Sequence, residues 1–363
     1  MWLTSSSVGR KFVMALTGIC LVLFVTFHVL MNAVALIWPT AYNQVCEFLG
    51  ANWYALIASA GLAALFIIHI IYALWLTVQN RKARGTDRYL VTSRPPQVEW
   101  SSKNMLVLGI VVLAFLVVHL IQFWAKMQWQ ELRHAELSVL PQLEGIPVGP
   151  AQGTLFIQMA FSCVWTPIIY IIGFIALWFH MNHGFWSMFH SIGWDNNIWI
   201  ERLKKISLWW TSIVVALFIA QAIVFTVQAN NKYYTQDQAL QEQYAEYWAE
   251  QADNLRQEYN DQISAAMKEA GDDPIKGQDA QLNFAMGYGK TFVEKAAMVD
   301  SAFTKMCNKV AMPEEIGILL RTSSQLQNYI NFIESQSAAM KAPAAQQEQP
   351  QADAEQESAN SNN

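Results

Sequence analysis

The chain has 363 residues, of which 53% are hydrophobic and only 14% are charged, and its net charge is −5. Its four cysteines form no C-x-x-C motif, which argues against an iron–sulfur cluster held by this chain, and no basic stripe indicates nucleic acid. Residues 1–229 carry 13 Lys and Arg against 8 Asp and Glu, whereas residues 230–363 carry 10 against 20. This change predicts a domain boundary near Asn230.

Residues 1–229 contain five long apolar runs with almost no charge. Each has at least ~20 residues, enough for a helix to cross a hydrocarbon core of ~30 Å. The first run is too long for a signal-peptide core and lacks a small-residue cleavage site, so it is counted as a helix. The sequence therefore predicts an all-α, five-helix transmembrane bundle, with runs over about 12–38, 53–78, 105–124, 155–180 and 206–227.

The positive charges between these runs predict the orientation. Eleven Lys and Arg lie before the first run, between the second and third, or between the fourth and fifth, whereas the other side has only Lys126 and Arg133. Because cytoplasmic loops carry the excess of positive charge, the N-terminus is expected in the cytoplasm. Five crossings then place the chain from residue 230 onward on the outer side of the membrane.

Residues 230–341 are expected to form a polar, mainly helical extension. Helix-favouring residues without Gly or Pro run from residue 233 to a Gly-Asp-Asp-Pro stop at 271–274. Further helices are expected over about 281–309 and after Met-Pro-Glu-Glu at 312–315, and residues 342–363 should be disordered. Cys46 and Cys307 would share the outer side, where a disulfide is permitted and two free thiols are the alternative.

Four of the seven histidines lie within the apolar runs, one in each of the first four: His28, His69, His119 and His180. Ionisable residues at membrane depth are costly and usually functional. Because successive helices alternate in direction, His28 and His119 fall in the outer half of the membrane, and His69 and His180 in the inner half. The sequence thus predicts two pairs, roughly 10–20 Å apart at ~1.5 Å per residue.

Two facing imidazoles suit the axial positions of a hexacoordinate haem iron. Zinc is the competing interpretation, but it needs three or four ligands, and the runs contain no Asp or Glu to complete a pair. His183 shares a helix face with His180, so either could point into the bundle. Arg10, Lys11 and His190 lie at the inner boundary as candidate partners for haem propionates, although Arg10 and Lys11 could equally be topology signals alone.

Four stretches together resemble the cytochrome b subunit of bacterial succinate dehydrogenases and fumarate reductases, of the single-chain kind with two haems. In that family the fourth-helix ligand is followed by glycine four positions later, which His180 and Gly184 match, so the resemblance implies His180 as ligand and His183 as reserve. Family pairing joins the first helix to the third and the second to the fourth. The stretches, within about residues 5–230, are LTGICLVLFVTFH (16–28), FIIHIIYALW (66–75), LVVHLIQFW (116–124) and FHMNHGFWSMFHSIGW (179–194).

The resemblance implies a respiratory-chain anchor in a bacterial cytoplasmic (inner) membrane, with its extension on the periplasmic side. Such a subunit binds a flavoprotein and an iron–sulfur protein on the cytoplasmic side and passes electrons to or from menaquinone through two b haems. FAD and the iron–sulfur clusters belong to those partners, so this chain alone would not be catalytic. A homodimer of these three-subunit assemblies is compatible with the resemblance.

Family members place a carboxylate near the quinone, and Glu47 is the only acid between the first two runs. It could exchange the quinone's protons, or it could be a plain solvated loop acid. Two features depart from the family. Trp178 stands where some members have a Glu used in a proton path, two positions before the ligand, and the long extension is unusual.

Two other interpretations stay open. The cytochrome b anchor of a formate dehydrogenase or hydrogenase would share haem and quinone but have other helix counts and histidine positions. A transporter with a histidine proton relay would more often show internal repeats and helices broken by Gly or Pro. No repeat is evident here, and Pro167 is the only proline inside the five runs.

Overall fold

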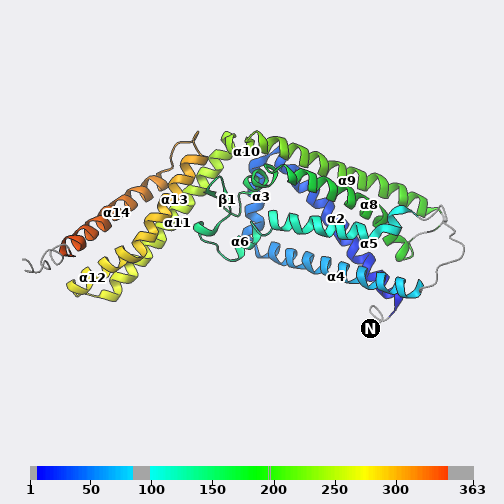
Figure 1. The fold of residues 1–363 in the computed structure, drawn as a ribbon, viewed down its shortest axis with the longest axis horizontal. Coiled ribbons are helices and arrows are strands. Elements are labelled where there is room, and N and C mark those ends of the chain that lie inside the picture. The colour runs from blue at the N-terminus through cyan, green and yellow to red at the C-terminus, as the bar shows by residue number, and fades with distance from the viewer. Residues whose placement is uncertain (1–5, 85–98, 195, 197, 342–363) are drawn as a thin grey trace, which may run out of the picture. The chain divides into compact units, whose positions relative to one another are not determined.

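The computed structural model describes residues 6–84, 99–194, 196 and 198–341, and nearly all of them are helical (Figure 1). The chain divides into two compact units, Met1–Gln243 and Tyr244–Asn363, which are described separately. Residues 342–363, expected to be disordered, lie outside the described residues.

Five helices of the first unit are long and apolar enough to cross a membrane, as predicted. Their first and last residues differ from the predicted runs by several positions, since polar residues at a membrane boundary can continue a helix. The five are α2 (Ser7–Ile37), α4 (Trp53–Arg84), α5 (Trp100–Gln122), α8 (Trp165–Ser191) and α9 (Trp199–Asn230).

The prediction of one helix over 155–180 is wrong. This run is divided between α7 (Gly153–Phe161) and α8, which carries the span. The break falls at residues 162–164, and Pro167 then lies in the first turn of α8, where its missing N–H costs no helical hydrogen bond. Composition concealed the break because α7 is almost entirely buried, and a buried short helix is as apolar as a membrane helix.

Helices α2 and α8 each contact three other spanning helices. Helix α2 contacts α4, α8 and α9, and α8 also contacts α5 and α9. Helix α8 approaches α5 so closely at Gly173 that a Cβ there would overlap the ring of Phe115. A glycine at this point therefore determines how closely these two histidine-bearing helices pack.

Short elements surround the end of the bundle where α2 ends and α4 begins, which we call the α3 end. Strands β1 (Gln142–Leu143) and β2 (Ile146–Pro147) form a hairpin whose turn residues, Glu144 and Gly145, have φ of 52° and 79°. Positive φ at both positions is what a type I′ turn requires. The other elements are α3 (Pro39–Ala51), α6 (Gln128–Leu132), the 3₁₀ helix η1 (Leu137–Val139), α7 and α10 (Tyr233–Gln236).

Asn43, on α3, forms side-chain hydrogen bonds to α7 and to the next long helix, α11 (Gln238–Ala270). Its Oδ1 accepts hydrogen bonds from the N–H and the hydroxyl of Thr154 at the start of α7, each 2.9 Å long. Its Nδ2 donates to Oε1 of Gln243, 2.9 Å away, in the second turn of α11. Because Asn43 is buried, these bonds satisfy an amide that would otherwise be costly to remove from water.

The second unit is helical, as predicted, but its second helix starts earlier than expected. Helix α11 ends at Ala270, and the φ of 65° at Gly271 is typical of the residue after a helix. Asp273 then caps α12 (Pro274–Phe284) by accepting from the N–H groups of Ile275 and Lys276, with Pro274 as the first helical residue. The Gly-Asp-Asp-Pro sequence therefore ends one helix and begins the next.

Helix α12 continues through a π-helical segment, η2 (Ala285–Gly289), into α13 (Lys290–Met306), which packs against α14 (Glu314–Lys341). The third helix, α14, is expected to begin after Met-Pro-Glu-Glu and instead begins at Glu314, within it. Buried residues recur every three or four positions along α13 and form one apolar face: Phe292, Ala296, Val299, Phe303 and Met306.

Candidate functional site

His28 and His119 lie side by side near the α3 end. Their ring centroids are 5.8 Å apart and the planes are almost perpendicular, at 84°. His28 is nine residues before the end of α2, and His119 is three before the end of α5. Aromatic rings crowd this pair: Phe24 stacks on His28 and Phe218 approaches it, while Phe115, Phe123 and Tyr170 contact His119.

His69 and His180 form a second pair with ring centroids 6.3 Å apart. They lie 16 and 15 residues from the α3-end termini of α4 and α8, so they are deeper in the bundle than the first pair. A Cβ on Gly109 would lie 3.6 Å from Cε1 of His180, and one on Gly18 would lie 4.0 Å from Cε1 of His69. Glycines of α5 and α2 therefore adjoin this pair.

These ring contacts join the same histidines that helix order and depth group together. At about 1.5 Å per residue, the two levels are roughly 10–20 Å apart along the helices. Among the residues that the structure describes, no three His, Cys, Asp or Glu side chains come together as a metal site. Each level thus offers two imidazoles.

A threonine fixes the orientation of His69. The Thr17 hydroxyl lies 3.1 Å from Nδ1 of His69 and donates its proton to a carbonyl of its own helix, that of Val13 or Met14, each 3.0 Å away. When the hydroxyl donates in this way, the same oxygen accepts from the Nδ1–H of His69. The Nε2 atom of His69 is consequently left with a lone pair.

A tyrosine does the same for His119. The Tyr170 hydroxyl donates to Oε1 of Gln122, 2.8 Å away, and lies 3.1 Å from Nδ1 of His119. It therefore accepts from Nδ1–H, and the lone pair of His119 is again on Nε2. The amide of Gln122 in turn donates to the hydroxyl of Thr166, 3.2 Å away, so three side chains from two helices support one histidine.

The remaining histidines of the pairs are held differently. Nδ1 of His180 is buried and has no hydrogen-bond partner among the described residues. The described neighbours of His28 are rings: Phe24, Phe218 and His119. Each pair thus combines one histidine held by a hydroxyl with one held by packing.

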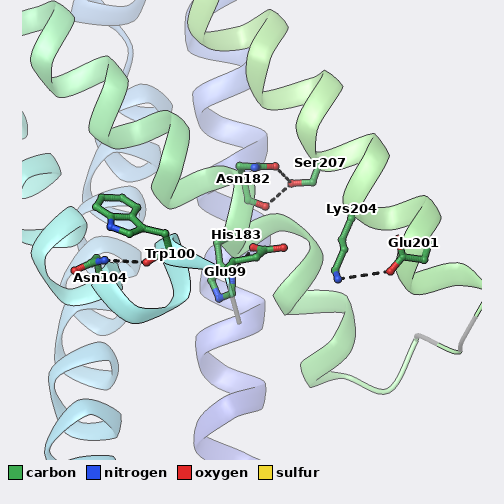
Figure 2. A network of polar contacts seen from close by, with 8 residues as sticks. All are labelled: Glu99, Trp100, Asn104, Asn182, His183, Glu201, Lys204 and Ser207. Carbon is green, nitrogen blue, oxygen red and sulfur yellow. Dashed lines mark hydrogen bonds and ion pairs between the residues drawn. The ribbon is translucent and has the colours of Figure 1, made fainter. Parts of the chain in front are cut away.

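His183, the reserve ligand, points elsewhere. Its Nδ1 lies 3.2 Å from a carboxylate oxygen of Glu99, just before α5 (Figure 2). Its ring packs edge-on against Trp186. Nearby, the Ser207 hydroxyl on α9 lies within hydrogen-bond distance of the backbone carbonyl and the side-chain oxygen of Asn182 (Figure 2). These contacts link α8 to its neighbours and separate the role of His183 from that of His180.

The candidate propionate partners lie toward the opposite end of the bundle from α3. Arg10 is half-buried, and its guanidinium lies over the ring of Trp75 on α4, 5.3 Å from the centroid. It is seven residues, roughly 10 Å, from Thr17. Lys11 is exposed, and so is His190 near the end of α8.

Glu47 is exposed on α3. The buried face of the same helix contains Tyr42 and Cys46, and both lie so close to Gly153 at the start of α7 that a Cβ there would overlap them. Burial raises the pKa of the Cys46 thiol to about 12 and the pKa of Tyr42 well above its usual range. All four cysteines are free thiols in the structure, including Cys307.

Trp178 and Lys126 each place a polar atom in apolar surroundings and give it a specific contact. Trp178, at the position where some members of the resembled family carry a glutamate, donates its indole N–H to the Ser212 hydroxyl on α9, 3.0 Å away. Lys126, one turn beyond Gln122, lies 3.1 Å from the sulfur of Met159, and partial burial lowers its pKa. The sequence signal for both was the same: a polar atom in an apolar context.

Three residues of the site were missed from the sequence: Thr17, Gln122 and Tyr170. They are polar residues inside or beside the apolar runs, which could have marked them, but only the helix packing shows that they reach histidines. No family model matches this chain, and neither the curated proteins nor the solved structures contain a significant match.

Proposed function

We propose that this chain is a membrane cytochrome b that binds two haems and passes electrons between a soluble partner and a quinone. The observation that carries this proposal is the pair of histidine pairs, at two levels of a bundle of five apolar helices.

The geometry of each pair fits axial ligation. An imidazole nitrogen binds a first-row metal at about 2 Å, so two imidazoles on opposite sides of one metal have ring centroids about 6 Å apart. The observed separations are 5.8 and 6.3 Å. Zinc needs three or four ligands and is supported less well by two imidazoles at each level.

The proton positions also fit. Thr17 and Tyr170 keep Nδ1 protonated on His69 and His119, which leaves Nε2 free to bind iron. Metal-bound histidines commonly donate their other N–H to an acceptor, which fixes the ring and raises its basicity. Gly18 and Gly109 leave space beside the second pair, where larger side chains would crowd it.

When bound, haem supplies a one-electron iron centre at each level. The chain's own residues do the rest. The four histidines would hold the iron, the aromatic rings around His28 and His119 would exclude water, and the hydroxyls of Thr17 and Tyr170 would orient the imidazoles. Arg10, held over Trp75, is placed to neutralise a propionate at the opposite end.

The finer proposal is the anchor subunit of a succinate dehydrogenase or fumarate reductase that uses menaquinone, and it rests on the four motif stretches. It places the α3 end and the second unit outside the cytoplasm, and the flavoprotein and iron–sulfur protein at the opposite end. The excess of Lys and Arg in the loops at that opposite end supports this orientation.

The test is the haem content of the purified full-length chain. A pyridine haemochrome assay should give two b haems per polypeptide, with a reduced spectrum typical of two histidine ligands. A haem-free protein would overturn the proposal, and one haem per chain would overturn the two-level arrangement. Succinate-dependent reduction of a naphthoquinone, present only when the two partner proteins are added, would test the finer part.

A further inference from the structure

We propose that Tyr170 is a positioning residue for His119, and that Gln122 and Thr166 hold it in place. The resemblance assigns no role to any of these three residues. They form a continuous chain of hydrogen bonds: His119 to Tyr170 (3.1 Å), Tyr170 to Gln122 (2.8 Å) and Gln122 to Thr166 (3.2 Å).

The packing allows Tyr170 little freedom. Its side chain is 4% exposed, and its ring contacts Phe115, Phe161 and Phe174 edge-on, with centroids 5.0, 5.2 and 5.8 Å away. The hydroxyl therefore cannot turn to another partner without moving the ring. Because this hydroxyl is fixed, so is the direction of the Nδ1–H of His119.

The two hydroxyls differ in where their own protons go. Thr17 donates to a carbonyl of its own helix, so the support of His69 ends within one turn. Tyr170 donates to a side chain on a different helix, α5, which also carries His119. The orientation of His119 therefore depends on the contact between α5 and α8. A substitution at Gln122 or Thr166 should alter the orientation of the His119 ring.

This inference rests on the proposed function, since its readout is bound haem. An imidazole whose N–H is held by an acceptor is a stronger donor to iron and favours the oxidised state. Removing the acceptor should weaken that donation. The midpoint potential at the His28–His119 level should then rise, while the potential at the His69–His180 level stays unchanged.

The experiment is a redox titration of the full-length Tyr170→Phe variant, followed by visible and electron paramagnetic resonance spectra. The two haem signals are first assigned with His119→Ala and His69→Ala. We expect two haems per chain, a raised potential and an altered paramagnetic signal at the His119 level only. Thr17→Val should give the reciprocal result at the His69 level, and Tyr54→Phe, an exposed tyrosine, should change neither.

Unchanged potentials and spectra in Tyr170→Phe would overturn the inference, and so would equal shifts at both levels. If that variant does not assemble, Gln122→Leu decides: a smaller shift in the same direction at the His119 level supports the inference, and no shift overturns it. A wild-type protein without haem would instead overturn the proposed function, so the two failures are distinguishable.

Discussion

The two histidine pairs have the same ligand type in different surroundings. His28 and His119 lie among aromatic rings at the end of the bundle that α3 and α7 adjoin. His69 and His180 lie deeper along their helices, beside glycines, on the side toward Arg10. The two pairs thus consist of the same side chain, histidine, but differ in the residues that surround them.

This difference indicates how a single chain can give two equivalent centres unlike properties. Burial among rings favours the less charged state of a metal centre, and a nearby guanidinium also favours the reduced state, by electrostatics. Under the proposed function, the first effect would act at the His28–His119 level and the second at the His69–His180 level. Each can be altered by substitution without touching a histidine.

The largest expected effect is the loss of one haem when a histidine is removed. Under the proposed function each pair would supply both protein ligands to one iron, so His28→Ala or His119→Ala should remove mainly the haem near α3, and His69→Ala or His180→Ala mainly the other. Haemochrome assays and low-temperature spectra of the purified variants measure this.

His183→Ala is the matched control for His180→Ala, one helical turn away. It should keep two haems, because His183 faces Glu99. If His183→Ala lost a haem and His180→Ala did not, the assignment of the second pair would be wrong.

A smaller effect is expected from Gly173→Ala, which tests whether close packing of α5 and α8 maintains the pair near α3. The added methyl overlaps Phe115, whose ring also contacts His119. Overpacking of this kind costs about 1–3 kcal/mol, so thermal unfolding should occur at lower temperature and the signal of that level should broaden. Gly61→Ala, with nothing near the added carbon, should leave both unchanged. Equal effects of the two substitutions would argue against a specific contact.

Arg10→Gln should sharpen the contrast from the other side. Arg10 is roughly 10 Å along α2 from Thr17, which contacts His69. At that separation and an effective dielectric constant of about 20, removing the positive charge changes the electrostatic energy of the reduced centre by about 1–2 kcal/mol, or roughly 50 mV for one electron. The midpoint potential at the His69–His180 level should fall by that order and the other should change little. Lys82→Gln, at an exposed lysine near the end of α4, serves as control. A fall at the His28–His119 level alone would refute this placement of Arg10.

The smallest effect concerns the closed packing of α3 on α7. Burial raises the pKa of Cys46 to about 12, so at pH 8 only about one thiol in 10,000 is ionised. Iodoacetamide should therefore modify Cys46 far more slowly than exposed Cys163, as peptide mass spectrometry can show.

The same thiol predicts a dependence of stability on pH. A raised pKa in the folded state means that its contribution is complete below pH 9 and is lost as the pH rises toward 12. The decline should not exceed about 1.4 kcal/mol per pH unit, and Cys46→Ala should reduce it. Rapid modification at pH 8 would show that α3 opens.

Sequence reasoning identified the five spans and the grouping of the histidines because both depend on composition and helix order. It failed at residues 155–180, where burial by protein and burial by lipid give the same apolar pattern. It also could not choose between His180 and His183 from spacing, since both lie on one helix face. That choice depends on Glu99, more than 80 residues away along the chain. The contacts of Thr17 with His69 and of Tyr170 with His119 likewise join helices that are distant in the sequence.

The hydrogen bonds of Asn43 determine where this chain can be divided. A cut at residue 229, where the composition changes, would remove Gln243 and leave the buried Asn43 amide without that acceptor, at a cost of about 1–3 kcal/mol. Gln243 also donates to the carbonyl of Thr40, so the cut would remove a second hydrogen bond. A shortened protein that keeps the bundle intact should therefore end after Gln243. The first turns of α11 belong structurally to the membrane unit, although they lie beyond the change in composition.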